Sequence, residues 1–83
     1  MSRLYVKEAT VVRLKDLMKT KGLTANNLSI LSGITPSTLY SLLKEERKDV
    51  SVNTVKKLCD GMGMTIREFF NSDLFDDLEV ELR

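Results

Sequence analysis

Residues 23–43 decide the fold of this chain, and they read LTANNLSILSGITPSTLYSLL. Gly33 divides this stretch, and glycine is suited to the left-handed residue that often follows the end of a helix. Thr24 can cap a helix before this glycine, because threonine is a favoured N-cap. Thr35 and Pro36 can open another helix after it, since proline fits the first helical position. The stretch therefore predicts two short helices joined by a tight turn.

The joint between these helices, expected over residues 25–32 and about 36–44, consists of Gly33 and Ile34 alone. So short a joint cannot form a long antiparallel hairpin, and it leaves the two helices crossing at a steep angle. A glycine-containing turn between two short helices is the sequence form of a helix-turn-helix. The inward positions expected on these two helices are Leu28, Leu31, Leu39, Leu42 and Leu43.

Apolar spacing and capping residues predict three further helices, at about residues 7–21, 52–62 and 66–70. Ser51 can cap the second of these, and Thr65 with Glu68 can form a capping box at the start of the third. Their expected inward positions are Val11, Leu14, Leu17, Met18, Val52, Val55, Leu58, Cys59, Met62, Ile66, Phe69 and Phe70. The fold class predicted is all-α, as a compact five-helix domain.

Composition places the chain among small globular domains and excludes several chemistries. It has 83 residues, of which 42% are hydrophobic, with 13 Lys and Arg against 12 Asp and Glu. One cysteine and no histidine exclude an internal disulfide, a histidine-based zinc site and a Ser-His or Cys-His nucleophilic pair. We therefore expect no enzymatic activity, no metal, no cofactor and no evident small-molecule site.

The same composition bears on where the protein resides. A lone cysteine fits a reducing compartment. The apolar runs are too short to span a membrane, and residues 1–7 lack the apolar stretch of a signal peptide. We expect a cytoplasmic protein with no membrane partner.

Charge is distributed unevenly along the chain. Residues 1–72 hold 12 Lys and Arg against 7 Asp and Glu, a net charge of +5, whereas residues 73–83 have a net charge of −4. We expect a domain over residues 1–72 and an acidic amphipathic extension over residues 73–83. The basic body suggests a nucleic-acid partner, although both regions could equally be ordinary solvated charge.

The extension is compatible with two conformations. Leu74, Leu78 and Leu82 fall four residues apart, as on a helix, whereas Leu78, Val80 and Leu82 alternate with acids, as on a strand. We favour a short helix. Its apolar residues could form a dimer surface or fold back on the monomer, or the acids could cover residues 44–48 and weaken DNA binding.

The helix-turn-helix stretch resembles that of phage repressor and Cro proteins and of their bacterial Xre-like relatives. Residues 23–29, 32–35 and 39–42 carry this resemblance, and residues 53–65 and 68–70 resemble the two following helices of the family. The similarity covers about residues 9–70. It implies a bacterial or phage-encoded transcriptional regulator that binds DNA sequence-specifically. Of the two kinds of regulator, a repressor is expected rather than an activator. It also implies a homodimer, at least on DNA, because a lone unit contacts few phosphates.

The resemblance also implies which residues meet double-stranded DNA. The recognition helix, about residues 36–44, would enter the major groove. Its base-facing positions are Thr35, Pro36, Ser37, Thr38, Tyr40, Ser41 and Lys44. The phosphate-facing positions are Thr24, Ala25 and Asn26 at the start of the preceding helix, and Arg47 and Lys48 beyond the recognition helix.

Three positions depart from the family pattern. Ala25 stands where relatives often have a phosphate-binding Gln, for which Asn26 or Asn27 could substitute. Pro36 stands where many relatives have a polar base reader. Met18 and Leu43 occupy the places of an Arg–Glu ion pair, and an apolar pair can replace a buried ion pair without loss of stability.

The recognition helix has one long cation and lacks Arg, Gln and Asn, the residues that read bases bidentately. We therefore expect modest sequence readout that uses Tyr40 against a thymine methyl and DNA shape. The alternative function is a helix-turn-helix protein-interaction module, such as an antitoxin-like partner or co-regulator, with little DNA binding.

Overall fold

The computed structural model describes residues 3–44 and 49–82, and these form helices with no strand. Five of the helices are α-helices and the sixth is a short 3₁₀ helix. They are α1 (Val6–Lys21), α2 (Ala25–Ser32), α3 (Pro36–Leu43), α4 (Val52–Met62), α5 (Ile66–Phe70) and η1 (Asp73–Phe75). The predicted all-α class and the order of the five α-helices are confirmed.

The helix starts follow the predicted caps. The hydroxyl oxygens of Thr24, Thr35, Ser51 and Thr65 each accept a hydrogen bond from the backbone amide three residues later. Such a cap satisfies one of the amides that the first helical turn leaves without a partner. Local sequence therefore defines where α2, α3, α4 and α5 begin.

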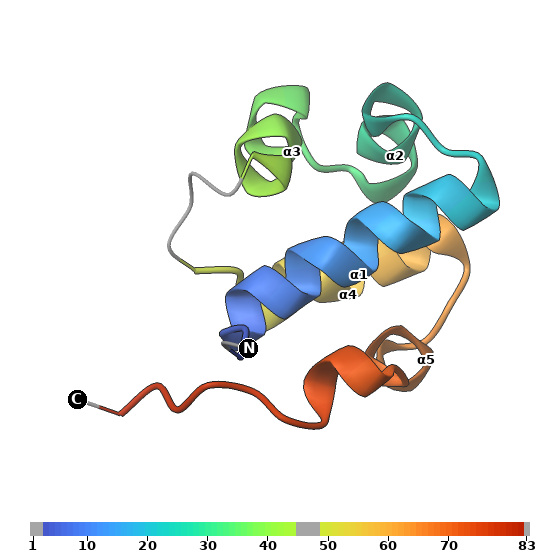
Figure 1. Cartoon of the computed structure of the whole chain (residues 1–83). Coiled ribbons are helices and arrows are strands. Elements are labelled where there is room, and N and C mark those ends of the chain that lie inside the picture. Colours follow the sequence, from blue (N-terminus) through green and yellow to red (C-terminus); the bar gives the residue numbers. More distant parts are fainter. Residues whose placement is uncertain (1–2, 45–48, 83) are drawn as a thin grey trace.

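The helices are arranged on two sides of a central pair. In Figure 1, α2 and α3 lie on one side of α1, α4 runs behind α1, and α5 with η1 lies on the other side. The core between them contains Val11, Leu14, Leu17, Met18, Leu28, Ile34, Leu39, Leu42, Val55, Leu58, Cys59, Met62 and Phe69. The core packs against the inner side of the α2–α3 pair. Among the described residues, no other helix covers the outer side of this pair.

The close approach of α2 to α4 depends on Gly61. A Cβ atom placed on Gly61 would lie 3.0 Å from the backbone nitrogen of Ser32 and 3.1 Å from the carbonyl carbon of Leu31. Both neighbours are backbone atoms, so a side chain at residue 61 would force the two helices apart.

Two apolar residues predicted to face the core are exposed. Leu31 is 55% exposed, whereas the buried and half-buried positions of α2 are Ala25, Leu28, Ser29 and Ser32. These four positions lie along one side of a helix, and residue 31 falls outside that arc. Val52 is 73% exposed because it borders an open groove at the start of α4. The inward assignments of Leu31 and Val52 are therefore wrong.

The helix predicted for the C-terminal extension is also wrong beyond residue 75. After a turn at Asp76 and a bend at Asp77 the chain has no regular secondary structure, and the Glu79 amide donates a 2.8 Å hydrogen bond to the Leu4 carbonyl. Arg3 forms ion pairs with Asp77 and Glu79 over 3.1 and 3.7 Å. These contacts hold the tail along the N-terminal segment. The domain boundary at residue 72 stays a prediction.

An aromatic cluster joins the tail to α5. The ring centroids of Phe70 and Phe75 are 4.8 Å apart, and those of Phe69 and Phe70 are 5.0 Å apart, both in edge-to-face arrangements. Phe75, Leu74 and Leu78 are half-buried in this arrangement. The start of the tail therefore folds back on the monomer.

Candidate nucleic-acid interface

The turn between α2 and α3 is held by a buried side-chain hydrogen bond. The Ser29 hydroxyl donates to the carbonyl oxygen of Ile34 over 2.5 Å. Gly33 adopts φ 72° between them, a left-handed conformation that glycine accepts without strain. The side chain of Ile34 is itself buried in the core. Together these features fix the path of the chain from α2 into α3.

Helix α3 is amphipathic, and its polar side chains lie on the outer face. Leu39 and Leu42 are buried and anchor its inner face. Of the predicted base-facing positions, Thr35, Pro36, Ser37, Tyr40 and Lys44 are exposed, whereas Thr38 and Ser41 are half-buried. The structure thus brings a hydroxyl-rich, weakly basic face together on α3.

Two hydroxyl groups of this face, those of Thr35 and Thr38, already form a hydrogen bond with each other at the start of α3. The Thr35 hydroxyl donates to the Thr38 hydroxyl over 2.8 Å and accepts the Thr38 amide. Thr35 therefore uses its hydrogen for the cap, while Thr38 keeps its own hydroxyl hydrogen for an acceptor outside the helix. Ser37 and Tyr40 remain the more exposed hydroxyl groups of the face.

The start of α2 exposes Thr24 and Asn26 and leaves Ala25 half-buried. The Asn27 side-chain oxygen accepts from the Thr24 amide and hydroxyl, which completes a capping box. Asn27 is therefore committed to the cap, and Asn26 is the better placed of the two amides to substitute for the missing Gln. A helix N-terminus at this position presents backbone amides that suit a phosphate.

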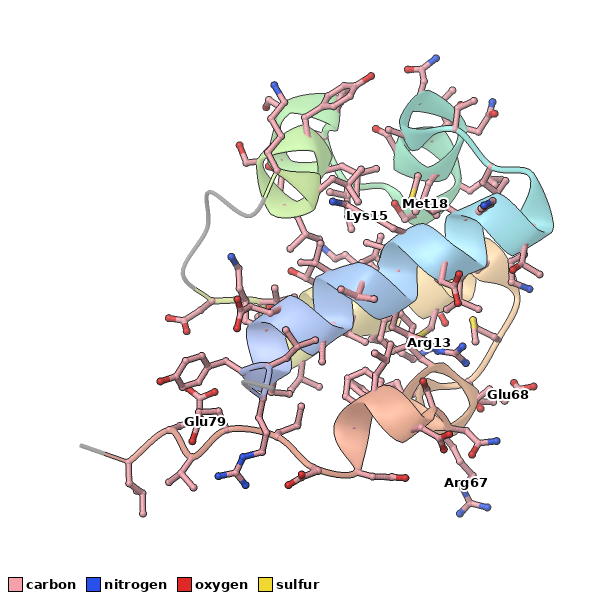
Figure 2. The ribbon with its side chains drawn as sticks, in the orientation of Figure 1. Arg13, Lys15, Met18, Arg67, Glu68 and Glu79 are labelled. Carbon is pink, nitrogen blue, oxygen red and sulfur yellow. The ribbon has the colours of Figure 1, made fainter. Side chains whose placement is uncertain are left out.

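Helix α1 contributes a cation, Lys15, that is not among the residues predicted to contact DNA. Lys15 and Met18 lie on the side of α1 that faces α2 and α3, as Figure 2 shows. Lys15 is exposed, while Met18 is buried and Leu43 is half-buried against the core. Lys15 follows buried Val11 by four residues and precedes Met18 by three, so it borders the inward stripe of α1. This spacing is the signal that could have identified it.

The acidic tail is remote from this face. Figure 1 places residues 73–82 on the side of α1 opposite α3, and in Figure 2 the labelled Glu79 lies beside the start of α1. The described part of the tail therefore does not cover Lys44. Arg47 and Lys48, predicted to approach phosphates, lie outside the described residues.

The only cysteine of the chain is part of the core. Cys59 is completely buried in α4. Burial raises the pKa of its thiol, and the negative charge of Asp60 raises it further. The thiol is therefore protonated, and a protonated thiol is a poor nucleophile and metal ligand. Within residues 3–44 and 49–82, no cluster of acidic residues and cysteine could hold a metal ion, and no helix is long and apolar enough to cross a membrane.

Comparison with known families agrees with this geometry. Residues 13–73 match a family model described as the Cro/C1-type HTH DNA-binding domain. Neither the curated proteins nor the solved structures provide a match. The family match covers more than half of the chain, so the chain belongs to the Cro/C1-type helix-turn-helix family. It is a DNA-binding domain of the class found in transcription regulators, a class that is typically non-enzymatic.

Proposed function

We propose that the chain is a sequence-specific transcriptional repressor that binds double-stranded DNA with α3 in the major groove. The observation that supports this most strongly is the outer face of α3, where polar side chains are exposed above a helix anchored by Leu39 and Leu42. The major groove is about 12 Å wide and admits one α-helix. Base contacts would come from Thr35, Pro36, Ser37, Thr38, Tyr40, Ser41 and Lys44.

Phosphate contacts position such a domain and supply most of its salt-dependent affinity. We propose these contacts for Thr24, Ala25 and Asn26 at the start of α2, for Lys15 of α1, for Lys44, which would meet a phosphate as well as bases, and for Arg47 and Lys48 after α3. Lys15 and Lys44 are both exposed cations. The acidic tail, on the opposite side of α1, leaves the surface accessible.

Tyr40 is the proposed main reader of sequence. It is the largest side chain on the outer face of α3 and is 48% exposed. Its ring can pack against a thymine methyl, while the neighbouring serines can accept or donate single hydrogen bonds. Such contacts discriminate between bases less than a bidentate Arg or Asn contact does. Sequence-dependent DNA shape would therefore contribute the rest of the sequence preference.

We propose that the repressor is a homodimer on its operator. One helix-turn-helix unit engages few phosphates, so its affinity for DNA at physiological salt is low. Two copies would read half-sites about 34 Å apart, which is one turn of the double helix.

Selection from a library of random duplexes, followed by sequencing, tests this proposal. The expected product is an inverted repeat with half-site centres about 10 base pairs apart. Transcription in vitro from a promoter that overlaps the selected site should fall when the protein is added. If the folded protein enriches no duplex sequence, the protein-interaction module becomes the better account.

A further inference from the structure

An apolar groove is lined by the first turns of α1 and α4, by the end of α5 and by the tail. Its volume is about 540 Å³, within the range of roughly 300–1,000 Å³ typical of small-molecule sites. The sequence gives no sign of it, because its walls come from four separate segments. Its apolar lining consists of Tyr5, Val6, Val50, Val52, Val55 and Phe70.

Within the described part of the chain, the apolar wall is open to solvent. Val52 is 73% exposed, Val6 is 41% exposed and Tyr5 is 39% exposed, whereas Val55 at the base is buried. Large apolar side chains gathered at one place without a covering element mark a surface that gains free energy when a ligand covers it.

Charge defines which ligand suits the groove. Among the residues that the structure describes, its charged lining consists of the carboxylates of Glu8, Asp49 and Glu81 and the ammonium group of Lys7. The position of Glu8 is fixed, because its Oε1 accepts the backbone amide of Tyr5 over 2.9 Å. An excess of negative charge beside an apolar wall attracts a cation and repels an anion. The rings of Tyr5 and Phe70 add faces against which a cation can pack.

The same charges disfavour two other occupants. DNA is repelled by the carboxylates. A second copy of the chain, related by a two-fold axis across the groove, would bring its own acidic tail, with a net charge of −4 over residues 73–83, against the first. A cationic ligand of drug size meets neither obstacle.

We propose that this groove binds a lipophilic cation, whose apolar body packs on the valines and whose charge lies among Glu8, Asp49 and Glu81. This site is separate from the outer face of α3. The proposal does not depend on the proposed repressor function, because ligand binding can be measured without DNA.

Two probes of the same shape and opposite charge test the proposal: tetraphenylphosphonium and tetraphenylborate. Each is titrated into the ¹⁵N-labelled full chain and followed by amide chemical shifts. We expect tetraphenylphosphonium to shift the amides of Val6, Val52 and Phe70, with an affinity at least about tenfold above that of tetraphenylborate, a difference of about 1.4 kcal/mol. Saturation should occur below about 1 mM.

Variants at exposed positions locate the site. Val52→Lys should lower the affinity for tetraphenylphosphonium about tenfold, whereas Ile30→Lys, equally exposed at 73% but on α2, should leave it unchanged. Glu81→Gln should lower the affinity about threefold, and Asp76→Asn, in the same tail but outside the groove lining, should not.

Four results would overturn the proposal. Equal affinity for the two probes would show an apolar groove without preference for cations. Shifts confined to amides elsewhere, or no saturation below about 1 mM, would show that the groove is not a ligand site. Groove amides that shift with protein concentration in the absence of any probe would show that a second copy occupies it.

Discussion

The hydroxyl of Ser29 in α2 donates a 2.5 Å hydrogen bond to the carbonyl oxygen of Ile34, across the turn that leads into α3. Ser29 is 5% exposed and Ile34 is 8% exposed, so water does not readily replace this bond. A buried carbonyl without a partner costs free energy. The bond therefore couples the position of the proposed recognition helix to the packing of α2.

We predict that Ser29→Ala destabilises the protein. The substitution removes the donor and leaves the Ile34 carbonyl buried, at a cost of about 1–2 kcal/mol in the free energy of unfolding. Urea denaturation followed by circular dichroism measures the change. Ser37→Ala, which removes an exposed hydroxyl from α3, is the matched control and should change stability little. Equal effects of the two variants would contradict the role assigned to Ser29.

Gly61→Ala should destabilise the protein although alanine is the better helix former by about 1 kcal/mol. The added Cβ would lie 3.0 Å from the backbone nitrogen of Ser32, and backbone of α2 cannot rotate away as a side chain can. We expect a net loss of about 1–3 kcal/mol, measured by urea denaturation. Asn53→Ala, at an exposed position of the same helix, should be neutral or slightly stabilising. A more stable Gly61→Ala variant would show that α2 and α4 are not closely packed.

Arg13 should stabilise the short helix α5 from α1. Its guanidinium donates to the carbonyl oxygens of Phe69 and Glu68 over 2.7 and 2.9 Å, at the end of α5, and Figure 2 shows it pointing toward that helix. Arg13→Met keeps much of the apolar stem and removes both donors, so it should lower stability by about 1–3 kcal/mol. Arg13→Lys keeps a single charged nitrogen, so the stability of this variant should lie between that of the parent and that of Arg13→Met. If Lys and Met variants unfold at the same denaturant concentration as the parent, these bonds contribute nothing.

Acid should weaken the start of α5 through Glu68. Its carboxylate accepts the Thr65 amide over 2.8 Å, and hydrogen bonds from Thr65 lower the pKa of Glu68 below its ordinary value of 4.5. A carboxyl whose pKa is lower in the folded state stabilises the fold above its unfolded pKa. That stability is lost as the pH falls below 4.5 and through the folded-state pKa.

Thermal unfolding midpoints between about pH 6 and pH 3 measure this effect. Glu68→Gln keeps an oxygen for the cap but does not titrate, so its midpoint should fall less between these pH values than that of the parent. Parallel curves for the two proteins would show that Glu68 does not contribute to the acid sensitivity.

Tyr40→Ala should reduce the preference for selected DNA over random DNA. Tyr40 is 48% exposed, so its removal should leave the fold intact. Loss of one base contact costs about 1–3 kcal/mol of discrimination, and the low end of that range, about fivefold, is expected for an apolar contact. Competition binding with random duplex measures the ratio. Val80→Ala, at an exposed position of the tail, should leave it unchanged. A sharp consensus unaffected by Tyr40→Ala would contradict the proposed readout.

Much of the fold could be predicted from the sequence because its helix boundaries are local. Thr24, Thr35, Ser51 and Thr65 each satisfy amides of the helix that follows them, whatever the helix packs against. The helix-turn-helix and the exposed face of α3 follow from these boundaries together with buried Leu39 and Leu42.

The predictions that are wrong concern positions where the sequence allows more than one local structure and tertiary contacts decide between them. Leu31 is exposed although α4 approaches the backbone of Leu31 and Ser32 at Gly61, because the side chains of α2 that are buried in this packing are those of Leu28 and Ser29. The tail fits a helix or a strand by spacing alone. Its path is decided by the Glu79–Leu4 hydrogen bond and the ion pairs of Arg3, which join residues at opposite ends of the chain.

Fluorescence anisotropy with a random duplex at several salt concentrations measures whether the face built on α3 binds DNA. We predict an affinity whose logarithm falls with the logarithm of salt by about 0.9 for each phosphate contact, and a slope about 0.9 smaller for Lys44→Gln. The exposed Lys57→Gln variant on α4, a helix that contributes none of the proposed contacts, should keep the slope of the parent. A folded protein that binds no duplex at low salt, or a slope unchanged by Lys44→Gln and reduced by Lys57→Gln, would contradict the proposal that this face binds DNA.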